Sequence, residues 1–164
     1  MAEKIYNVLF VCTGNAARSI IAEVIMNHLG CDRFRAYSAG SQPSGVVHPM
    51  TLGVLTDQGY DLTGLRSKSW TEFAKPEAPQ MDFIFSVCDQ AAGEACPAWP
   101  GQPITAHWGF ADPTAMVGDR EQQLKAFRMA ELQIANRIRL FLELGIDRID
   151  RMSLQVKLRE LGDA

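Results

Sequence analysis

The sequence predicts an α/β protein with a doubly wound, parallel β-sheet, because short β-rich apolar runs alternate with segments of helical periodicity. The first run, residues 5–11, is almost entirely apolar, which is typical of a strand buried on both faces. It continues directly into a loop of small residues and then into a helical pattern. Parallel sheets of this kind bind ligands beyond the carboxyl ends of their strands. We therefore expect the functional site there.

The other elements follow from local patterns. Apolar residues at positions 21, 24, 25 and 29 predict a helix that Gly30 ends. A second helix is expected at residues 49–59, which begin with proline and end with glycine. We expect the other strands at residues 34–38, 83–87 and, with a weaker pattern, 103–106.

A long amphipathic helix is predicted between Glu121 and Leu144, with Gly145 after it. A short helix around residues 154–161 is expected to close the chain. The predicted apolar face of the long helix consists of Leu124, Phe127, Leu132, Ala135, Ile138 and Leu142.

Length and composition limit the classes of function. With 164 residues the chain has the size of one domain, and 16 Lys and Arg against 19 Asp and Glu give a net charge of −3. This balance, without a basic block, argues against a general nucleic-acid binder. No apolar run is long enough to span a membrane, and the first residues lack the pattern of a signal peptide. We expect a cytoplasmic protein whose four cysteines are not structural disulfides.

The loop after the first strand combines Cys12 with Arg18 at the start of a helix, where backbone N–H groups and the helix dipole favour an anion. Small residues let the loop amides approach a tetrahedral oxyanion, and Arg18 adds a fork of donors. The same electropositive setting is expected to lower the pKa of the Cys12 thiol, with a hydrogen bond from Ser19. The candidate oxyanion-binding residues are Thr13, Gly14, Asn15, Ala16, Ala17 and Arg18.

The segment VCTGNAARS, residues 11–19, resembles the loop of the low-molecular-weight protein tyrosine phosphatase superfamily, which includes the thioredoxin-coupled arsenate reductases. The resemblance continues in Ser-Ala-Gly at residues 38–40 and in a late Asp-Pro, so it covers most of the chain. It implies a single domain over residues 1–164, with a four-stranded parallel sheet flanked by helices on both faces. It also implies that Cys12 is the nucleophile and that Arg18 binds the oxyanion.

Asp112 is the general acid that the resemblance implies. A thiolate that attacks phosphorus or arsenic expels an oxygen, which leaves more easily when it is protonated. Pro113 stiffens the loop that carries Asp112, although an ordinary Asp-Pro turn is the alternative interpretation.

The surroundings of Asp112 favour the arsenate reductase branch. His107-Trp108-Gly109, followed by Asp-Pro, resembles that branch. The phosphatase branch typically carries aromatic residues after Asp-Pro that grip a phosphotyrosine ring, whereas residues 114–116 are Thr-Ala-Met and no tyrosine follows Tyr60. Trp108 as a core residue and His107 as a structural histidine are equally open interpretations.

Cys88 and Cys96 match the resolving cysteines of the arsenate reductases that the sequence resembles, in which one cysteine follows the third strand and another lies shortly after it. Residues 89–95 are small and polar, so we expect the two sulfurs to be able to meet. The predicted relay passes the oxidation from Cys12 to Cys88 and Cys96, and then to an external dithiol such as thioredoxin or a glutaredoxin-type reductant. The alternatives are two buried thiols, or a zinc site with His107 whose spacing fits poorly. We expect no bound cofactor and no metal.

Two departures from the family pattern bear on function. Ala17 stands where many members carry a cysteine, which slightly disfavours a phosphatase. Some reductases bind potassium near the loop, and we hypothesise that Lys68 takes the place of that cation, against the alternative of an exposed lysine. Cys31 has no partner in the relay and is interpreted as structural.

Three functions remain. The leading one is an arsenate reductase that uses Cys12, Cys88 and Cys96 with arsenate as substrate. The second is a phosphotyrosine phosphatase of the same superfamily, whose loop binds phosphate. The third is a redox-responsive protein that binds an oxyanion such as phosphate or sulfate without catalysis, which Asp112 disfavours.

Overall fold

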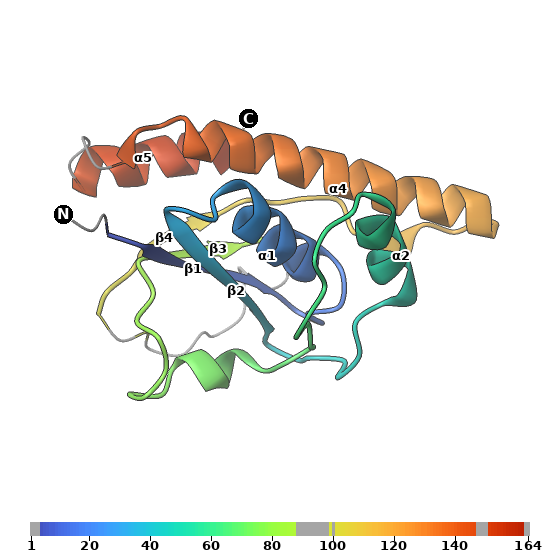
Figure 1. Ribbon diagram of the computed structural model, residues 1–164, viewed down its shortest axis with the longest axis horizontal. Helices are drawn as coiled ribbons and strands as arrows, with labels where there is room; N and C mark the ends of the chain where they lie inside the picture. Colours follow the sequence, from blue (N-terminus) through green and yellow to red (C-terminus); the bar gives the residue numbers. More distant parts are fainter. Residues whose placement is uncertain (1–3, 88–98, 100, 147–150, 163–164) are drawn as a thin grey trace.

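The computed structural model describes residues 4–87, 99, 101–146 and 151–162 (Figure 1). Its four strands, all parallel, form one sheet in the order β2-β1-β3-β4. The predicted parallel α/β fold is therefore confirmed, with strand limits within about two residues of those expected. The strands are β1 (Tyr6–Cys12), β2 (Phe34–Gly40), β3 (Phe83–Ser86) and β4 (Ile104–His107).

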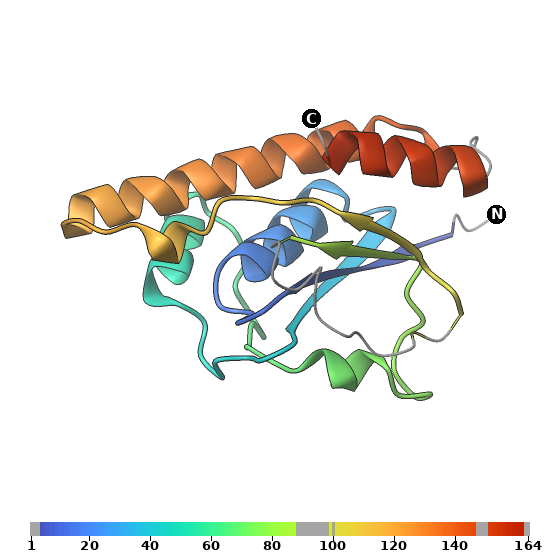
Figure 2. The same cartoon turned by 180° about the vertical axis from the view of Figure 1, so that it is seen from behind.

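The helices lie on both faces of the sheet, as predicted. Helices α1, α4 and α5 cover one face, and the 3₁₀-helix η1 lies on the opposite face (Figures 1 and 2). The sequence patterns did not predict η1 or the second 3₁₀-helix, η2, because single turns have no apolar periodicity. The helices are α1 (Arg18–Leu29), α2 (Pro49–Asp57), η1 (Trp70–Phe73), η2 (Pro113–Ala115), α4 (Arg120–Leu142) and α5 (Arg151–Gly162).

The core lies mainly between the sheet and helices α1, α4 and α5. Strand β1 is buried on both faces, as its apolar run predicts. The Trp108 ring stacks on Phe85 at 3.9 Å between centroids and meets Phe141 of α4 edge-on. Its indole N–H donates to the carbonyl of Leu158, so the polar atom of this buried side chain has a hydrogen-bond partner. Trp108 is thus a core residue, one of its two open interpretations.

The apolar face predicted for α4 is wrong at Leu132, whose side chain is 51% exposed. Ile134 lies at the centre of the buried stripe of α4. Leu132 lies about 160° around the helix from Ile134, so it faces the opposite side. A capping box between Asp119 and Gln122 begins α4. The buried stripe consists of Phe127, Ala130, Ile134, Ala135, Ile138 and Phe141.

The sheet places the loop after β1 beside the end of β2. Cys12 is opposite Gly40 in the register of β1 and β2. Val87, which follows β3, donates its N–H to the carbonyl of Val11 at 2.9 Å, on the other side of β1. The ends of three adjacent strands therefore surround the loop. Within the described part of the chain, no helix combines the length and hydropathy needed to cross a bilayer.

Candidate active site

Cys12 ends β1 and is almost completely buried. Its Sγ lies 2.8 Å from the Oγ of Ser19, in the first turn of α1, and accepts the N–H of Asn15 at 3.2 Å. The structure therefore contains the Ser19 contact that the sequence predicts. Two polar groups directed at one sulfur favour its thiolate form over the thiol.

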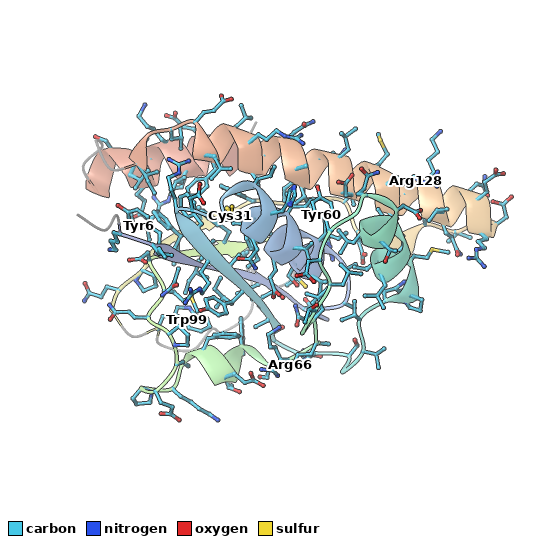
Figure 3. The ribbon with its side chains drawn as sticks, in the orientation of Figure 1. Tyr6, Cys31, Tyr60, Arg66, Trp99 and Arg128 are labelled. Carbon is cyan, nitrogen blue, oxygen red and sulfur yellow. The ribbon has the colours of Figure 1, made fainter. Side chains whose placement is uncertain are left out.

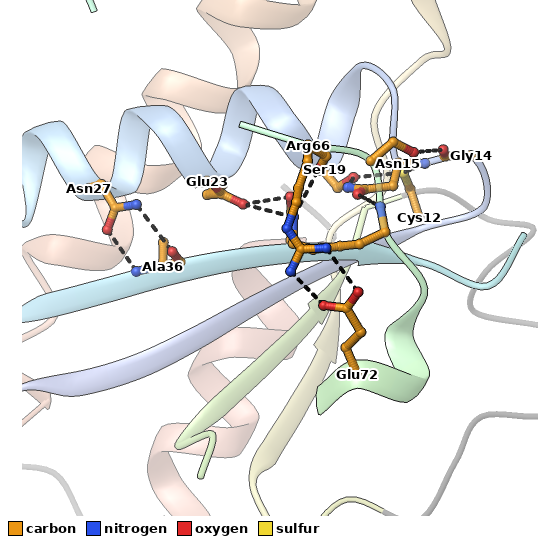
Figure 4. Close-up of polar contacts among 12 residues, drawn as sticks. Cys12, Gly14, Asn15, Ser19, Glu23, Asn27, Ala36, Arg66 and Glu72 are labelled. Atoms are coloured by element: carbon orange, nitrogen blue, oxygen red, sulfur yellow. Dashed lines mark hydrogen bonds and ion pairs between the residues drawn. The ribbon is translucent and has the colours of Figure 1, made fainter. Parts of the chain in front are cut away.

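Asn15 fixes the direction of the Ser19 hydroxyl. Its backbone is left-handed, with φ at 48°, a conformation that asparagine tolerates better than most residues. Its side-chain N–H donates to Ser19 Oγ at 2.8 Å, and its Oδ1 accepts the N–H of Lys68 at 2.9 Å (Figure 4). Because Ser19 Oγ accepts from Asn15, its single proton is available for the sulfur of Cys12.

Loop carbonyl groups are held away from the site by the segment that follows β2. Backbone N–H groups of that segment donate to them over 2.9–3.1 Å. Peptide groups whose carbonyls are bound on the outer side present their N–H groups on the inner side, which builds an anion-binding concavity. The donor–acceptor pairs are Ser41 to Cys12, Gln42 to Thr13, Ser44 to Gly14 and His48 to Ala16.

Gly40 makes this close approach possible. A Cβ at residue 40 would lie 2.4 Å from the carbonyl oxygen of Thr13 and 3.0 Å from the Cβ of Asn15. No side chain fits between the end of β2 and the loop. In the sequence, Gly40 stands out only as part of the family resemblance, although a glycine at a strand end is a signal of close backbone approach.

Arg18 and Asp112 lie together, although they are far apart in the sequence. Arg18 Nη2 is 3.5 Å from Asp112 Oδ2, and Arg18 Nη1 donates to the carbonyl of Phe110 at 3.0 Å. The Arg18 side chain is 16% exposed and that of Asp112 is 39% exposed. The guanidinium is thus held by two groups of the segment before η2, beside the loop that carries Cys12.

Lys68 is buried, with its side chain only 8% exposed, so the alternative of an exposed lysine is wrong. Its ammonium lies 3.7 Å from Glu23 Oε1 and donates to the carbonyl of Arg66 at 2.9 Å (Figure 4). The same Glu23 oxygen accepts the hydroxyl of Ser38 at 2.7 Å. Burial raises the pKa of Glu23, opposed mainly by the Ser38 hydrogen bond, and lowers the pKa of Lys68, opposed by attraction to Glu23.

Cys88 and Cys96 lie outside the described residues. His107 Nδ1 and Ser86 Oγ are 2.9 Å apart across β3 and β4, which gives this histidine a hydrogen-bond partner within the sheet. Cys31 follows α1 and is exposed (Figure 3). Its interpretation as a structural residue therefore gains no support from burial in the core. Among the described residues, no cluster of three His, Cys, Asp or Glu side chains could hold a metal ion.

Sequence reasoning missed two side chains of the site. Glu23 lies on the face of α1 that points at β2, where an acidic residue is unexpected without knowledge of Lys68. Thr114 donates both its N–H, at 2.9 Å, and its hydroxyl, at 2.6 Å, to Asp112 Oδ1. The Asp-Pro-Thr order is a signal for such a turn, because a residue two positions after Asp is placed to donate to its carboxylate.

Comparison with known proteins identifies the family. Residues 7–144 match the family described as low molecular weight phosphotyrosine protein phosphatase. The chain therefore belongs to this family.

Individual relatives carry names from two activities. An arsenate reductase of Shouchella clausii is 32% identical over 145 residues, which cover 88% of this chain and 99% of the relative. The solved structure of "an arsenate reductase in the phosphate binding state" is 28% identical with a TM-score of 0.68, covering 84% of this chain and 97% of the other. A low molecular weight protein tyrosine phosphatase from T. tengcongensis has a TM-score of 0.67 at 22% identity over 84% of this chain and 98% of its own. The fold alone therefore does not separate the two activities.

Proposed function

We propose that this protein is an arsenate reductase in which Cys12 is the nucleophile and Cys88 and Cys96 complete a thiol–disulfide relay. The observation that carries the proposal is the placement of Cys12 Sγ, with Ser19 Oγ at 2.8 Å, in a loop whose Arg18 pairs with Asp112. Relatives named arsenate reductase align over most of the chain and support arsenate as the substrate. We further propose that the 164 residues form one domain.

The first step joins arsenic to the sulfur of Cys12. The loop amides and Arg18 bind arsenate, and the Cys12 thiolate attacks the arsenic. An S–As bond forms and an As–O bond breaks. The leaving group is a hydroxyl of arsenate, which takes a proton from Asp112 and departs as water. Arsenic remains in its +5 state in this step.

The relay then transfers two electrons. The thiolate of Cys88 attacks the Cys12 sulfur, so that a Cys12–Cys88 disulfide forms and the S–As electron pair leaves with arsenic, now in the +3 state, as arsenite. The thiolate of Cys96 attacks the Cys88 sulfur, which releases Cys12 and forms a Cys88–Cys96 disulfide. An external dithiol protein, of thioredoxin or glutaredoxin type, reduces this disulfide. The N–H of Val87, the residue before Cys88, donates to the carbonyl of Val11, the residue before Cys12. This contact between the two segments supports the proposed transfer from Cys12 to Cys88.

A reducing compartment fits this chemistry. The relay needs three free thiols and a reduced dithiol protein, which the cytoplasm maintains. We propose that the protein works there, without a bound cofactor.

The family description also favours a second candidate, the hydrolysis of phosphotyrosine. The same loop and Asp112 serve a phospho-cysteine intermediate that water hydrolyses. The segment after Asp112, Thr-Ala-Met at residues 114–116, offers no aromatic ring to hold a tyrosyl group. Arsenate reduction is therefore the better-supported activity.

Lys68 is proposed to supply the positive charge that a bound potassium ion supplies in some reductases of this family. The Lys68 ammonium pairs with Glu23, and the Lys68 backbone N–H donates to the side chain of Asn15 in the loop. Lys68 therefore places a positive charge next to the anion-binding loop. Arsenate reduction that rises strongly with added potassium, but not with sodium, would contradict this role.

The experiment that tests the proposed function follows NADPH oxidation with arsenate, thioredoxin and thioredoxin reductase. Wild type should turn over, whereas Cys12→Ser, Cys88→Ser and Cys96→Ser should each lose turnover. Cys31→Ser is the matched control and should retain it, since Cys31 is exposed and outside the relay.

The competing activity is measured on the same variants with an aryl phosphate. Full arsenate turnover by Cys88→Ser and Cys96→Ser would refute the relay. Strong aryl phosphate hydrolysis by every variant except Cys12→Ser, without arsenate reduction, would instead establish the phosphatase.

A further inference from the structure

Thr114 holds one oxygen of the Asp112 carboxyl group from two directions. Its backbone N–H donates to Asp112 Oδ1 at 2.9 Å and its hydroxyl donates to the same oxygen at 2.6 Å. The other oxygen, Oδ2, faces Arg18 Nη2 at 3.5 Å. The two oxygens of this carboxyl group are thus in different surroundings.

This difference decides where a proton on Asp112 resides. A protonated oxygen is a donor, and a proton on Oδ1 would compete for space with the two donors of Thr114. Oδ2 faces one donor, Arg18 Nη2, at the longer distance of 3.5 Å, so a proton on Oδ2 meets less conflict. Under the proposed function, Oδ2 also lies on the side of Arg18, which binds the oxyanion. A proton on Oδ2 is therefore directed at the oxygen that must leave.

We propose that Thr114 is a positioning residue that fixes the orientation of Asp112 and places its acidic proton on Oδ2. This proposal rests on the proposed function, in which Asp112 is the general acid. The backbone N–H bond to Oδ1 also caps the 3₁₀-helix η2, and it exists with any residue except proline at position 114. The hydroxyl bond is the part that depends on threonine.

Thr114→Val tests the hydroxyl, because valine keeps the shape and the backbone donor. With Oδ1 of Asp112 held by the backbone N–H alone, we expect kcat for arsenate reduction to fall roughly five- to tenfold, while KM changes little. Thr114→Ser keeps the hydroxyl and should retain turnover close to that of wild type. Urea unfolding of each variant checks that the fold is unchanged, as expected for an exposed side chain.

The Asp112→Asn background separates positioning of the acid from a structural effect. An asparagine has no proton of this kind to place, so adding Thr114→Val to Asp112→Asn should cause no further loss of kcat. An equal loss in both backgrounds, or an unchanged kcat in Thr114→Val, overturns the role of Thr114. Full turnover by Asp112→Asn alone refutes the general acid itself, which is a failure of the proposed function and is recognised separately.

Discussion

The Cys12 sulfur lies 2.8 Å from the Ser19 hydroxyl, whose oxygen accepts a hydrogen bond from the side chain of Asn15. Because the Ser19 oxygen accepts from Asn15, the Ser19 proton is free to point at the sulfur. The Ser19 hydroxyl therefore acts as a donor to the Cys12 sulfur. A donor of this kind stabilises a thiolate more than a thiol. The geometry therefore couples the ionisation of Cys12 to Ser19 and, through it, to Asn15.

Ser19→Ala should raise the pKa of the Cys12 thiol, because the thiolate loses its hydroxyl donor. The rate of alkylation of Cys12 by iodoacetamide, followed against pH, measures this pKa directly. We expect the midpoint to move up by roughly one unit, as for the loss of one hydrogen bond to a charged group. An unchanged midpoint would show that the loop amides alone stabilise the Cys12 thiolate, without the Ser19 hydroxyl.

Arg18→Lys should weaken oxyanion binding by roughly ten- to a hundredfold, since an ammonium cannot replace a planar fork of donors. Inhibition by phosphate, measured as its inhibition constant in the arsenate assay, reports this affinity. Arg33→Lys is the matched control, because Arg33 precedes β2 at the end of that strand opposite Gly40 and Cys12, and its guanidinium donates to the carbonyl of Leu142. Equal phosphate affinity in Arg18→Lys and wild type would contradict the role of Arg18.

Gly40→Ala should destabilise the fold by about 1–3 kcal/mol, because the new Cβ would overlap the carbonyl oxygen of Thr13. Urea denaturation measures the free energy of unfolding. Gly53→Ala, in the exposed part of α2 with open space around it, should instead stabilise by about 0.5–1 kcal/mol. Similar effects of the two substitutions would mean that the loop moves aside without cost.

Glu23→Gln should change how stability depends on pH. The raised pKa of Glu23 means that the folded protein binds this proton more tightly than the unfolded chain does. That contribution is present below the ordinary value of 4.5 and is lost as pH rises through the higher folded pKa. The difference in unfolding free energy, wild type minus Glu23→Gln, should therefore fall as pH rises above 4.5.

Glu72→Gln is the matched control for this pH dependence. The hydrogen bonds from Arg66 lower the pKa of Glu72, so its contribution to stability is present above 4.5 and is lost as pH falls. The corresponding difference should rise with pH, and only weakly, since the pair is exposed. The same sign for both glutamates would contradict the burial argument for Glu23.

Much of the fold and the loop could be predicted from the sequence, because both depend on local patterns. The apolar run of β1 and the small residues after it specify a buried strand and a loop whose amides can approach an anion. The predicted face of α4 is partly wrong because two exposed leucines, Leu132 and Leu140, interrupt the periodicity.

The rest of the site depends on contacts between distant segments, which no local pattern contains. Glu23 belongs to α1 and Lys68 to the segment before η1, which pairs with the end of β2 at Gly40 and Ser69. The fold brings the two side chains to 3.7 Å. The family resemblance implies the separate roles of Arg18 and Asp112, whereas their pairing is seen only in the structure. The hydrogen bond from the Thr114 hydroxyl to Asp112 is local in the sequence. Its effect on the general acid depends on which carboxyl oxygen faces Arg18, and only the structure gives that.

The most direct test of the account identifies the disulfide that remains after a single turnover. The protein is treated with one equivalent of arsenate without a reductant, digested, and its peptides are identified by mass spectrometry. Wild type should contain a Cys88–Cys96 disulfide, and Cys96→Ser should contain a Cys12–Cys88 disulfide, each with one equivalent of arsenite. Arsenate left unreduced, or a disulfide that involves Cys31 in place of these pairs, would contradict the relay.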